Sequence, residues 1–272
     1  MESVTIETAP NTKNEEPPVK NKALADDWLS PEANSKQVRS RLAEDLLASG
    51  HSQTTEEWIQ RTLNLRFKVV ASFANAQPCV TFDGRTYLYS HINHRSNKLA
   101  QALIAFGVKP GQSLGVALAR GFDRFVVMLA VLKAGAVWVP IAADSKTLFI
   151  RTIEGAVQLS ATICDLDNTS KFEDPLPLFR LDQDANERPA DLPWISLQED
   201  DKYGVFFDEF SSDLQGYSLT HRDLSEQVEN LVIGASSEEE DLPVFAQTPV
   251  AAHLEALGWW NAIWTGDLVS LD

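Results

Sequence analysis

Cysteine is nearly absent from this chain, and its scarcity excludes two kinds of site. The 272 residues include only two cysteines, Cys79 and Cys164, which lie far apart in the sequence. Two thiols at no metal-ligand or redox spacing support neither a disulfide framework nor a cysteine-bound metal, and no metal site is expected. Both are predicted to be buried thiols of a protein in a reducing compartment.

Positive charge is also scarce. The sequence has 23 Lys and Arg against 39 Asp and Glu, which gives a formal net charge of −16. The acidic excess is concentrated in residues 165–213 and 223–242, and the second of these stretches has no Lys or Arg. Such a chain repels phosphate-rich surfaces, so neither nucleic acid nor an anionic membrane is an expected partner.

No uninterrupted apolar run is long enough to span a membrane. The longest one, residues 125–143, is broken by a lysine, a glycine and a proline, which predicts a helix followed by a buried strand. The polar, Pro-containing residues 1–25 have no signal-peptide pattern and are expected to be disordered. They open a flexible N-terminal extension, 1–50, ahead of one domain at 51–272, and a cytoplasmic location is expected.

Hydrophobic periodicity predicts helices that alternate with strands. Helices are expected at 36–48, 55–74, 90–106, 124–133, 147–158, 221–233 and 254–263. Strands are expected at 79–82, 86–89, 113–118, 137–141, 161–164, 203–207, 244–247 and 267–271. Several of these strands are apolar throughout, which is typical of an α/β fold with a layered parallel or mixed sheet flanked by helices. The stretch 165–201 is long for a plain loop and is expected to contain short elements.

Individual residues mark several element ends. The pair Asp83-Gly84 predicts a tight hairpin turn between two strands. Ser90 and Asp123 can cap the helices that follow them, and Gly107 is expected to end the first of these helices. The apolar face of that helix is predicted to consist of Ile92, Leu99, Leu103 and Phe106.

Two segments in the first half of the chain carry motif-like sequence. Residues 131–140 read Val-Leu-Lys-Ala-Gly-Ala-Val-Trp-Val-Pro, and residues 86–92 read Thr-Tyr-Leu-Tyr-Ser-His-Ile. The first segment resembles the second core motif of adenylate-forming (AMP-binding) domains, Leu-Lys-Ala-Gly-x-Ala-Tyr-Val-Pro. The other is similar to their first motif, of the Leu-Thr-Tyr-x-Glu-Leu type. Such domains occur in nonribosomal peptide synthetases and acyl-CoA ligases, and the resemblance, closest over 55–165, implies the front part of their large domain.

The stretch 203–222 is where this resemblance places the phosphate-binding loop. A strand, a polar loop and a helix are expected in that order, a layout in which backbone N–H groups and a helix N-terminus can hold phosphate. The family motif here is Tyr-Thr-Ser-Gly-Ser-Thr-Gly-x-Pro-Lys-Gly, which aligns from Phe206 to Gly216. The implied loop residues, which form a degenerate version of the motif, are Asp208, Glu209, Ser211, Ser212, Asp213 and Gly216.

The composition of this loop predicts that it does not bind phosphate. Residues 208–216 include the carboxylates of Asp208, Glu209 and Asp213, and they include no Lys or Arg. Lysines at the x position and the Lys position of the family motif are therefore both missing, since Asp213 and Gln215 stand there, and Phe207 stands at the motif's Thr. Carboxylates repel a phosphate where the family provides lysines and hydroxyls, so no cofactor is expected.

The remaining candidate pocket residues are two histidines, His221 and His253. The family's fourth motif, Phe-Asp-x-Ser, aligns with residues 252–255 and places His253 at the Asp that pairs with a substrate amino group. The resemblance thus gives no support for an amino acid substrate, whereas a histidine near this place in acyl-CoA ligases allows an acyl or aryl group. His221 supports the loop in the family. The simpler interpretation of His253 is a residue at a helix start with no ligand.

A second resemblance near the end of the sequence competes with this alignment. Trp264-Thr265-Gly266-Asp267-Leu268 is similar to the family's later Tyr-x-Thr-Gly-Asp-Leu motif, whose Asp holds ribose hydroxyls. The 32-residue spacing between the two histidines favours the fourth-motif alignment instead. We do not expect Asp267 to be a ribose ligand.

Two functional hypotheses follow from these patterns. The preferred one is a truncated, catalytically inactive adenylation-like domain, with no catalytic residues of its own, that serves as an interaction module or is a remnant of a synthetase. The alternative is one half of a split carboxylate-adenylating ligase, completed by another chain, that would use ATP and Mg²⁺ on an acyl, aryl or amino acid. The family's later motifs are absent from the sequence, and no other catalytic pattern replaces them.

The end of the sequence also predicts association with a protein partner or a second copy. The strand 267–271 is expected to have an unpaired edge. In helix 254–263, we expect Leu254, Leu257 and Ala262 to face the sheet. We expect apolar surface around Trp259, Trp260 and Trp264 to be uncovered.

Overall fold

The computed structural model describes residues 62–191, 195–207, 216–234, 251–265 and 268–271. Several sequence predictions lie outside these residues and stay predictions: the extension 1–50, the helix 36–48, the strand 244–247, and loop residues Asp208, Glu209, Ser211, Ser212 and Asp213. The same holds for Asp267 and for the side chain of Trp264. Over the described ranges the α/β prediction is confirmed, since parallel strands alternate with helices.

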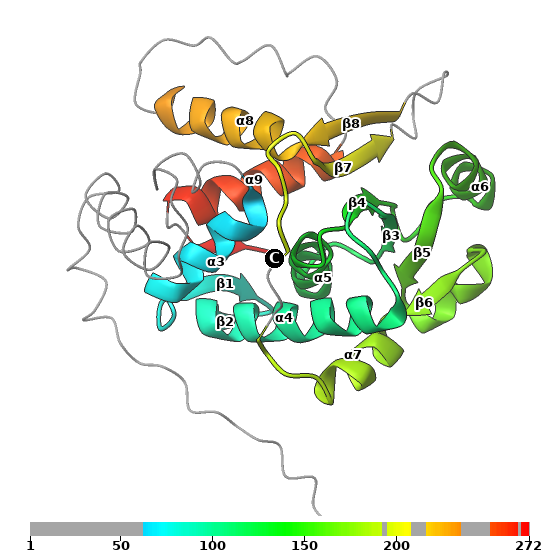
Figure 1. The fold of residues 1–272 in the computed structure, drawn as a ribbon, viewed down its shortest axis with the longest axis horizontal. Coiled ribbons are helices and arrows are strands. Elements are labelled where there is room, and N and C mark those ends of the chain that lie inside the picture. Colours follow the sequence, from blue (N-terminus) through cyan, green and yellow to red (C-terminus); the bar gives the residue numbers. More distant parts are fainter. Residues whose placement is uncertain (1–61, 192–194, 208–215, 235–250, 266–267, 272) are drawn as a thin grey trace, which may run out of the picture.

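The main sheet has the strand order β6-β5-β3-β4-β7-β8 in the described part of the chain (Figure 1). Its strands are β3 (Ser113–Ala117), β4 (Val137–Pro140), β5 (Leu159–Cys164), β6 (Pro175–Pro177), β7 (Lys202–Phe207) and β8 (Gly216–Thr220). All neighbours from β6 to β7 are parallel, and β8 runs antiparallel to β7. The predicted short elements in 165–201 are confirmed as β6, the 3-10 helix η1 (Leu166–Lys171) and helix α7 (Leu178–Asn186).

A second, smaller sheet has the order β2-β1-β9. Its strands are β1 (Pro78–Phe82), β2 (Arg85–Leu88) and β9 (Val269–Ser270). The hairpin prediction is confirmed, because β1 and β2 are antiparallel and Asp83 and Gly84 both have positive φ, 49° and 68°, as a tight hairpin turn requires. Strand β9 joins β1 in parallel, so two segments nearly 190 residues apart in sequence share a sheet.

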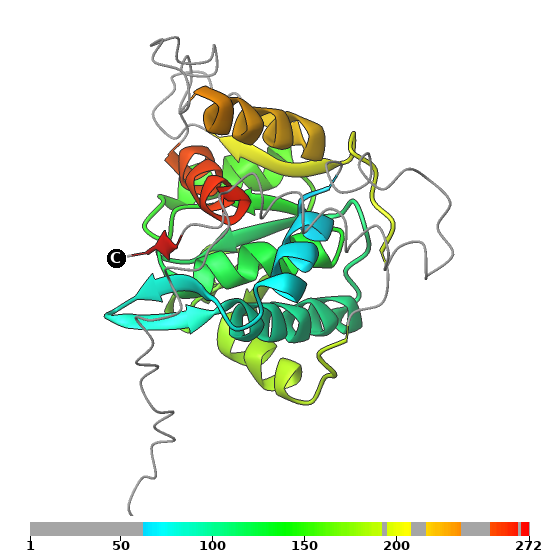
Figure 2. The same cartoon turned by 90° about the vertical axis from the view of Figure 1, so that its left-hand side faces the viewer.

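Helices cover both faces of the main sheet. They are α3 (Leu63–Phe73), α4 (Tyr89–Phe106), α5 (Phe122–Lys133), α6 (Thr147–Ala156), α7, α8 (His221–Gly234) and α9 (Ala251–Thr265). The larger core cluster includes residues of α3, α4, α5, α8 and α9, whereas α6 contributes Ile150 and Ile153 to a separate cluster on the opposite face. Figure 2 shows α8 and α9 at one end of the molecule and α4 with α7 at the other.

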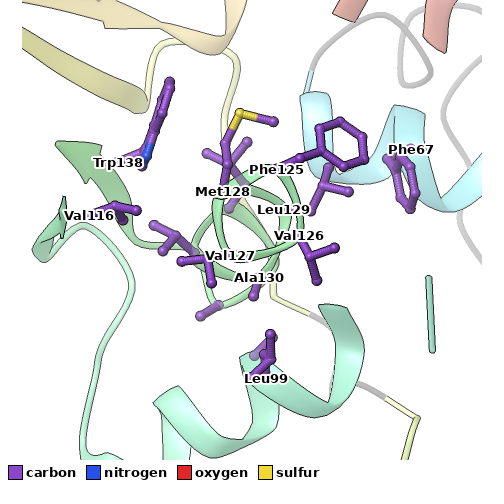
Figure 3. Close-up of a cluster of buried hydrophobic side chains, with 14 of the residues drawn as sticks. Phe67, Leu99, Val116, Phe125, Val126, Val127, Met128, Leu129, Ala130 and Trp138 are labelled. Carbon is purple, nitrogen blue, oxygen red and sulfur yellow. The ribbon is translucent and has the colours of Figure 1, made fainter. Parts of the chain in front are cut away.

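Helix α5 is the centre of the fold. Every residue from Arg124 to Lys133 is buried, as expected for a helix that is apolar around most of its circumference. Figure 3 looks along this helix, with Val116 and Trp138 of the sheet on one side, Leu99 of α4 below and Phe67 of α3 on the right. The helix is thus enclosed by β3, β4, α4 and α3.

Lys133, the lysine of the second-motif resemblance, ends α5 inside the core. Its ammonium donates to Asn93 Oδ1, Ser96 Oγ and Asn97 Oδ1, each at 2.7 Å, and lies 4.8 Å from the ring centroid of Phe67. Burial lowers the pKa of Lys133 well below its usual value. Three acceptors require three donated hydrogens, so the charged form satisfies this site. The lysine therefore ties α5 to α4 through hydrogen bonds and to α3 through the aromatic ring.

Two predicted helix caps are wrong. Helix α4 begins at Tyr89, one residue before Ser90, and the N–H groups of Tyr89 and Ser90 donate to the carbonyls of Gln77 and Asn75. Helix α5 begins at Phe122, so Asp123 lies in its first turn, where it forms an ion pair with Arg95 at 2.8 Å. In both cases contacts with another segment replace the local capping bond.

The apolar face predicted for α4 is correct except at its end. Ile92, Leu99 and Leu103 are fully buried, but Phe106 is 58% exposed at the last turn. The predicted end at Gly107 is confirmed by a left-handed φ of 106° and by hydrogen bonds back to Ile104 and to Leu103. The last turn of α4 therefore extends beyond the hydrophobic core.

The predicted surface at the end of the chain is also wrong in part. Strand β9 pairs with β1, and Leu271 N–H donates to Thr81 O at 3.0 Å. Among the described strands β9 is the last of its sheet, so the prediction of an unpaired edge is not contradicted. Trp259 and Trp260 are buried, whereas Leu254, expected to face the sheet, is 49% exposed. Trp259 faces inward against α5, where its ring is edge-on to that of Phe125 with the ring centroids 5.2 Å apart.

Candidate functional site

The β7–β8 hairpin positions the loop to which the phosphate-binding motif was assigned. The strand predicted at 203–207 is confirmed as β7, but β8 was not predicted. It pairs with β7 from Phe207↔Gly216 to Lys202↔Thr220. The observed order is thus strand, loop, strand, helix, and helix α8 begins five residues, or roughly 17 Å of extended chain, after the loop. Strand β8 thus stands between Gly216 and α8, which corrects the predicted order of strand, loop and helix.

Helix α8 has a well-formed start at the place predicted for it. Thr220 N–H and Oγ1 donate to Asp223 Oδ2 at 2.7 and 2.8 Å, and Asp223 N–H donates back to Thr220 Oγ1 at 3.1 Å. This reciprocal arrangement satisfies donors at the helix N-terminus. The acidic side chain already occupies the position that an anion would need.

Gly216 and Phe207 are the described residues at the two ends of the loop. Phe207 is buried, and its ring packs directly on Gly216, because a Cβ on this glycine would lie 2.8 Å from the Phe207 Cζ. The glycine that matches the family motif thus serves here as a surface for an aromatic ring. At these two positions the Thr of the family motif is replaced by a phenylalanine whose ring covers the glycine.

His253, on α9, is fully engaged within the protein. Its Nδ1 lies 3.0 Å from the Tyr203 hydroxyl and its Nε2 lies 2.9 Å from Gln227 Oε1. The ring is also edge-on to Phe206 at 5.1 Å. Burial lowers the pKa of His253 and raises that of Tyr203 well above its usual value, so both are neutral near pH 7. Each ring nitrogen has a protein partner, whichever tautomer is present.

His221, at the start of α8, is engaged in the same region. Its Nδ1 accepts a hydrogen bond from the N–H of Leu63, the first residue of α3, at 3.3 Å. Its ring centroid lies 6.3 Å from that of Tyr203. Burial lowers the pKa of His221 to about 4. The neutral imidazole therefore acts as an acceptor that joins α8 to the N-terminus of α3.

The structure brings the two predicted histidines together around Tyr203, and this residue was not singled out in the sequence. Gln227, the other partner of His253, was missed as well. Both residues could have been noticed in the sequence. Tyr203 places a hydroxyl within the apolar strand β7, and Gln227 places an amide next to Val228 on the buried face of α8. Their pairing depends on α9 packing against α8, which no local pattern predicts.

A buried ion pair under α9 was also missed. Arg124 Nη2 of α5 lies 3.4 Å from Glu255 Oε2, and Arg124 Nη1 donates to Leu118 O at 3.2 Å. Both side chains are mostly buried, with exposed fractions of 6% and 11%. The exposed Arg120 lies 3.9 Å from the same carboxylate. Glu255 occupies the Ser position of the fourth-motif resemblance, and its charge is used to hold α9 on α5.

The described residues were also searched for a metal site and for a membrane-spanning helix, and neither is found among them. No group of three His, Cys, Asp or Glu side chains in the described ranges is placed to hold a metal ion. None of the described helices is both long and apolar enough to cross a membrane. Cys79 and Cys164 are both buried and free, and burial raises the pKa of their thiols to about 12 and about 11.

Comparison with known proteins identifies the family. A family model described as "AMP-binding enzyme" matches residues 67–213, more than half of the chain. The chain therefore belongs to the AMP-binding enzyme family, and the resemblance seen in its motifs is confirmed.

Curated relatives share part of this sequence. The chain is 30% identical over 118 residues to the dimodular nonribosomal peptide synthase of Bacillus subtilis, a match of 43% of this chain and 4% of that protein. It is 29% identical over 157 residues to novobiocin biosynthesis protein H of Streptomyces niveus, covering 56% of this chain and 25% of that protein. The chain thus spans a quarter or less of these two relatives.

Solved structures show the same fold. The N-terminal subdomain of Klebsiella oxytoca NpsA, in complex with 3-hydroxyanthranilyl-AMSN, has a TM-score of 0.65 to this structure at 20% identity. The match covers 78% of this chain and 53% of that chain. At this identity the likeness establishes the fold, which is that of the N-terminal subdomain of adenylate-forming enzymes.

Proposed function

We propose that this chain is a catalytically inactive adenylation-like domain that acts as an interaction module. The observation that carries the proposal is the composition of the β7–β8 loop, with carboxylates at Asp208, Glu209 and Asp213 and no Lys or Arg. Each charge-assisted hydrogen bond that is lost weakens phosphate binding by about 1.5–3 kcal/mol. Two missing lysines therefore weaken ATP binding by about 100-fold or more, before the repulsion between carboxylates and phosphates is added.

The histidines support the proposal independently of the loop. The nitrogens of His253 hydrogen-bond to Tyr203 and Gln227, and Nδ1 of His221 accepts the Leu63 N–H. Groups that could have contacted a substrate or the loop are instead used to hold α3, α8 and α9 together. In this proposal the domain keeps the family scaffold for binding a protein, either a partner or a second copy.

An exchange assay tests the absence of catalysis. The purified chain is incubated with ATP, Mg²⁺, labelled pyrophosphate and, in turn, sets of aryl, acyl and amino acids. We expect no label to enter ATP above the level without acid. Acid-dependent exchange by the chain alone would overturn the proposal.

A second candidate function is one half of a split ligase that adenylates a carboxylic acid with ATP and Mg²⁺. The observation that favours it is that an N-terminal subdomain of NpsA was solved with 3-hydroxyanthranilyl-AMSN, and this chain shares that fold. The candidate requires that exchange appear when the chain is mixed with a protein encoded beside it. Exchange in the mixture, and in neither component alone, would favour this second function.

A further inference from the structure

Helix α3 is capped at its N-terminus by a residue from another element of the fold. Thr62, the residue before the helix, makes no side-chain capping bond, and the first turn of α3 has no acidic residue. The N–H of Leu63 donates instead to Nδ1 of His221, at 3.3 Å. The first N–H groups of a helix have no partner within it, so this imidazole does the work of an N-cap. The start of α3 is therefore joined to the start of α8 by one neutral histidine.

His221 can accept this hydrogen bond only while its Nδ1 carries no proton. A protonated imidazole has two N–H donors and no acceptor, so the N–H of Leu63 would then face another N–H. The new positive charge would also lie at the N-terminus of α3, which is the positive end of the helix dipole. The histidine is 1% exposed, so water does not replace the lost partner while α3 stays in place. Protonation of His221 is therefore incompatible with the contact.

His253, the other buried histidine of this region, is held in a way that tolerates a second proton. Its Nδ1 lies 3.0 Å from the Tyr203 hydroxyl oxygen, and its Nε2 lies 2.9 Å from Gln227 Oε1. Both partner atoms are oxygens that can accept, so a protonated ring donates to each of them. Acid therefore costs a hydrogen bond at His221 and none at His253.

The titratable groups around His221 do not provide a new partner for a protonated ring. Asp201, which precedes β7, favours the charged form, but burial has the larger effect and lowers the pKa of His221 to about 4. Tyr203 of β7 faces the ring and is neutral, because burial raises its pKa well above the usual value. On α8 itself, Asp223 already accepts two hydrogen bonds at the helix start, and Arg222 is exposed.

The neighbouring elements add no compensating charge over their described lengths. The charged residues of α3 are Arg66 and Lys68, both cations. On α9, the carboxylate of Glu255 lies 3.4 Å from Arg124 and is used by that pair. The titratable group of β8 is Tyr217. A proton on His221 therefore adds positive charge beside a helix whose own charged side chains are positive.

The surface that α3 covers includes polar atoms. Phe67 of α3 lies over the Lys133 ammonium, which is 4.8 Å from the ring centroid, and its ring centroid is 6.0 Å from that of Tyr89. The ammonium also has Asn93 and Ser96 as acceptors. Water can hydrate these groups when α3 leaves, which makes its departure less costly than exposure of an entirely apolar surface.

We propose that the contact between His221 Nδ1 and the Leu63 N–H is an acid-sensitive latch, whose protonation releases α3 while the main sheet stays folded. Release uncovers Leu63 and Phe67, which are fully buried when the latch is closed. The inference goes beyond the proposed function, because it concerns an opening of the fold that does not involve ATP.

Amide hydrogen exchange of the full chain, followed by mass spectrometry of its peptides, tests the latch. The open form has an ordinary histidine with a pKa of 6.5 and the closed form one of about 4, so the open population grows as the pH falls. Between pH 6.5 and pH 4 this difference predicts an increase of about 80-fold. Protection factors, which correct for the intrinsic effect of pH on exchange, are expected to fall by about this factor in α3. Helix α6, in the separate core cluster, is the internal reference and is expected to change much less.

A pair of matched substitutions assigns the effect to His221. In His221→Asn the side-chain oxygen replaces Nδ1, accepts the Leu63 N–H and does not titrate in this range. Protection of α3 in this variant is expected to lose most of its pH dependence. His94 is exposed on α4, and His94→Asn is expected to keep the pH dependence of the unaltered chain. Where thermal unfolding shows that His221→Asn is not folded, His221→Gln takes its place, and the comparison of α3 with α6 in the unaltered chain decides if neither variant folds.

Three results would overturn the latch. Equal loss of protection in α3 and α6 would mean that acid unfolds the whole domain. Constant protection of α3 down to pH 4 would mean that protonation does not release the helix. An unchanged pH dependence in a folded His221 variant would mean that another group is responsible. None of these results bears on adenylation, which the pyrophosphate exchange assay tests, so the latch and the proposed function fail separately.

Discussion

Two regions of the molecule carry the family's motifs, and they differ in which motif residues they retain. The region of α4, α5 and β4 keeps the lysine of the second motif, and Lys133 has three hydrogen-bond acceptors inside the core. The β7–β8 hairpin keeps the strand pairing and Gly216 of the third motif but has an aromatic ring where a hydroxyl is expected. Residues that build the fold and residues that hold the ligand can therefore change independently.

The largest expected effect is in the first of these regions. Lys133→Met keeps the length of the side chain but leaves the acceptors of Asn93, Ser96 and Asn97 without their shared donor. Hydrogen bonds to a charged group contribute about 1.5–3 kcal/mol each, partly offset by the cost of burying the charge, so we expect a loss on the order of 3 kcal/mol. Urea unfolding followed by tryptophan fluorescence measures it.

The exposed Lys109 provides the control for this substitution. Lys109→Met is expected to change the free energy of unfolding by less than about 0.5 kcal/mol. Equal stability of the Lys133 and Lys109 variants would contradict the structural role of the buried ammonium. It would also mean that the second-motif lysine does not stabilise the region of α4, α5 and β4.

The second expected effect is a pH dependence of stability that arises from His221, which follows the β7–β8 hairpin. The pKa of His221 is about 4 in the folded protein against 6.5 as its ordinary value, so the unfolded chain binds this proton first as the pH falls. The free energy of unfolding is therefore expected to decrease between pH 6.5 and pH 4, by about 3 kcal/mol from this group. Denaturant unfolding at a series of pH values measures the decrease.

A substitution isolates the contribution of this histidine from that of the carboxylates. His221→Gln retains an oxygen that can accept the Leu63 N–H but cannot titrate in this range. The variant is expected to lose less stability than the unaltered chain between pH 6.5 and pH 4. Identical pH profiles would show that His221 does not lose a hydrogen bond on protonation.

The smallest effect tests the packing at the hairpin. Gly216→Ala places a methyl group against the Phe207 ring, and overpacking of this kind costs about 1–3 kcal/mol. The control is Gly155→Ala in α6, where no atom lies within 4 Å of the added carbon. That change is expected to be neutral or stabilising by up to about 1 kcal/mol. A Gly216→Ala variant as stable as the original would mean that the ring is free to move.

The sequence predicts most elements because their signals are local. The hairpin turn at Asp83-Gly84 and the helix end at Gly107 need only the left-handed backbone of those residues. Helix α5 and strand β4 follow from one apolar run divided by a glycine. Strand β8 was missed because Gly216–Thr220 is short and partly exposed, and pairing with β7 defines it.

The site is less predictable because its contacts join distant segments. His253 meets Tyr203 and Gln227 across 50 and 26 residues of sequence, and Leu63 meets His221 across 158. The orientation of α9 is a similar case, since this helix has large apolar residues on most of its circumference. Contact with Phe125 decides which side is buried, and the position of Phe125 is known only once α5 is placed.

The most direct test of the central claim is an isothermal titration of the unaltered full chain with ATP and Mg²⁺. The account predicts no measurable heat of binding at ATP concentrations up to the millimolar range, because the loop has three carboxylates and no lysine and Phe207 covers Gly216. A dissociation constant of about 1 μM would contradict it, since that affinity requires about 8 kcal/mol of binding free energy from a site that lacks the charges to supply it.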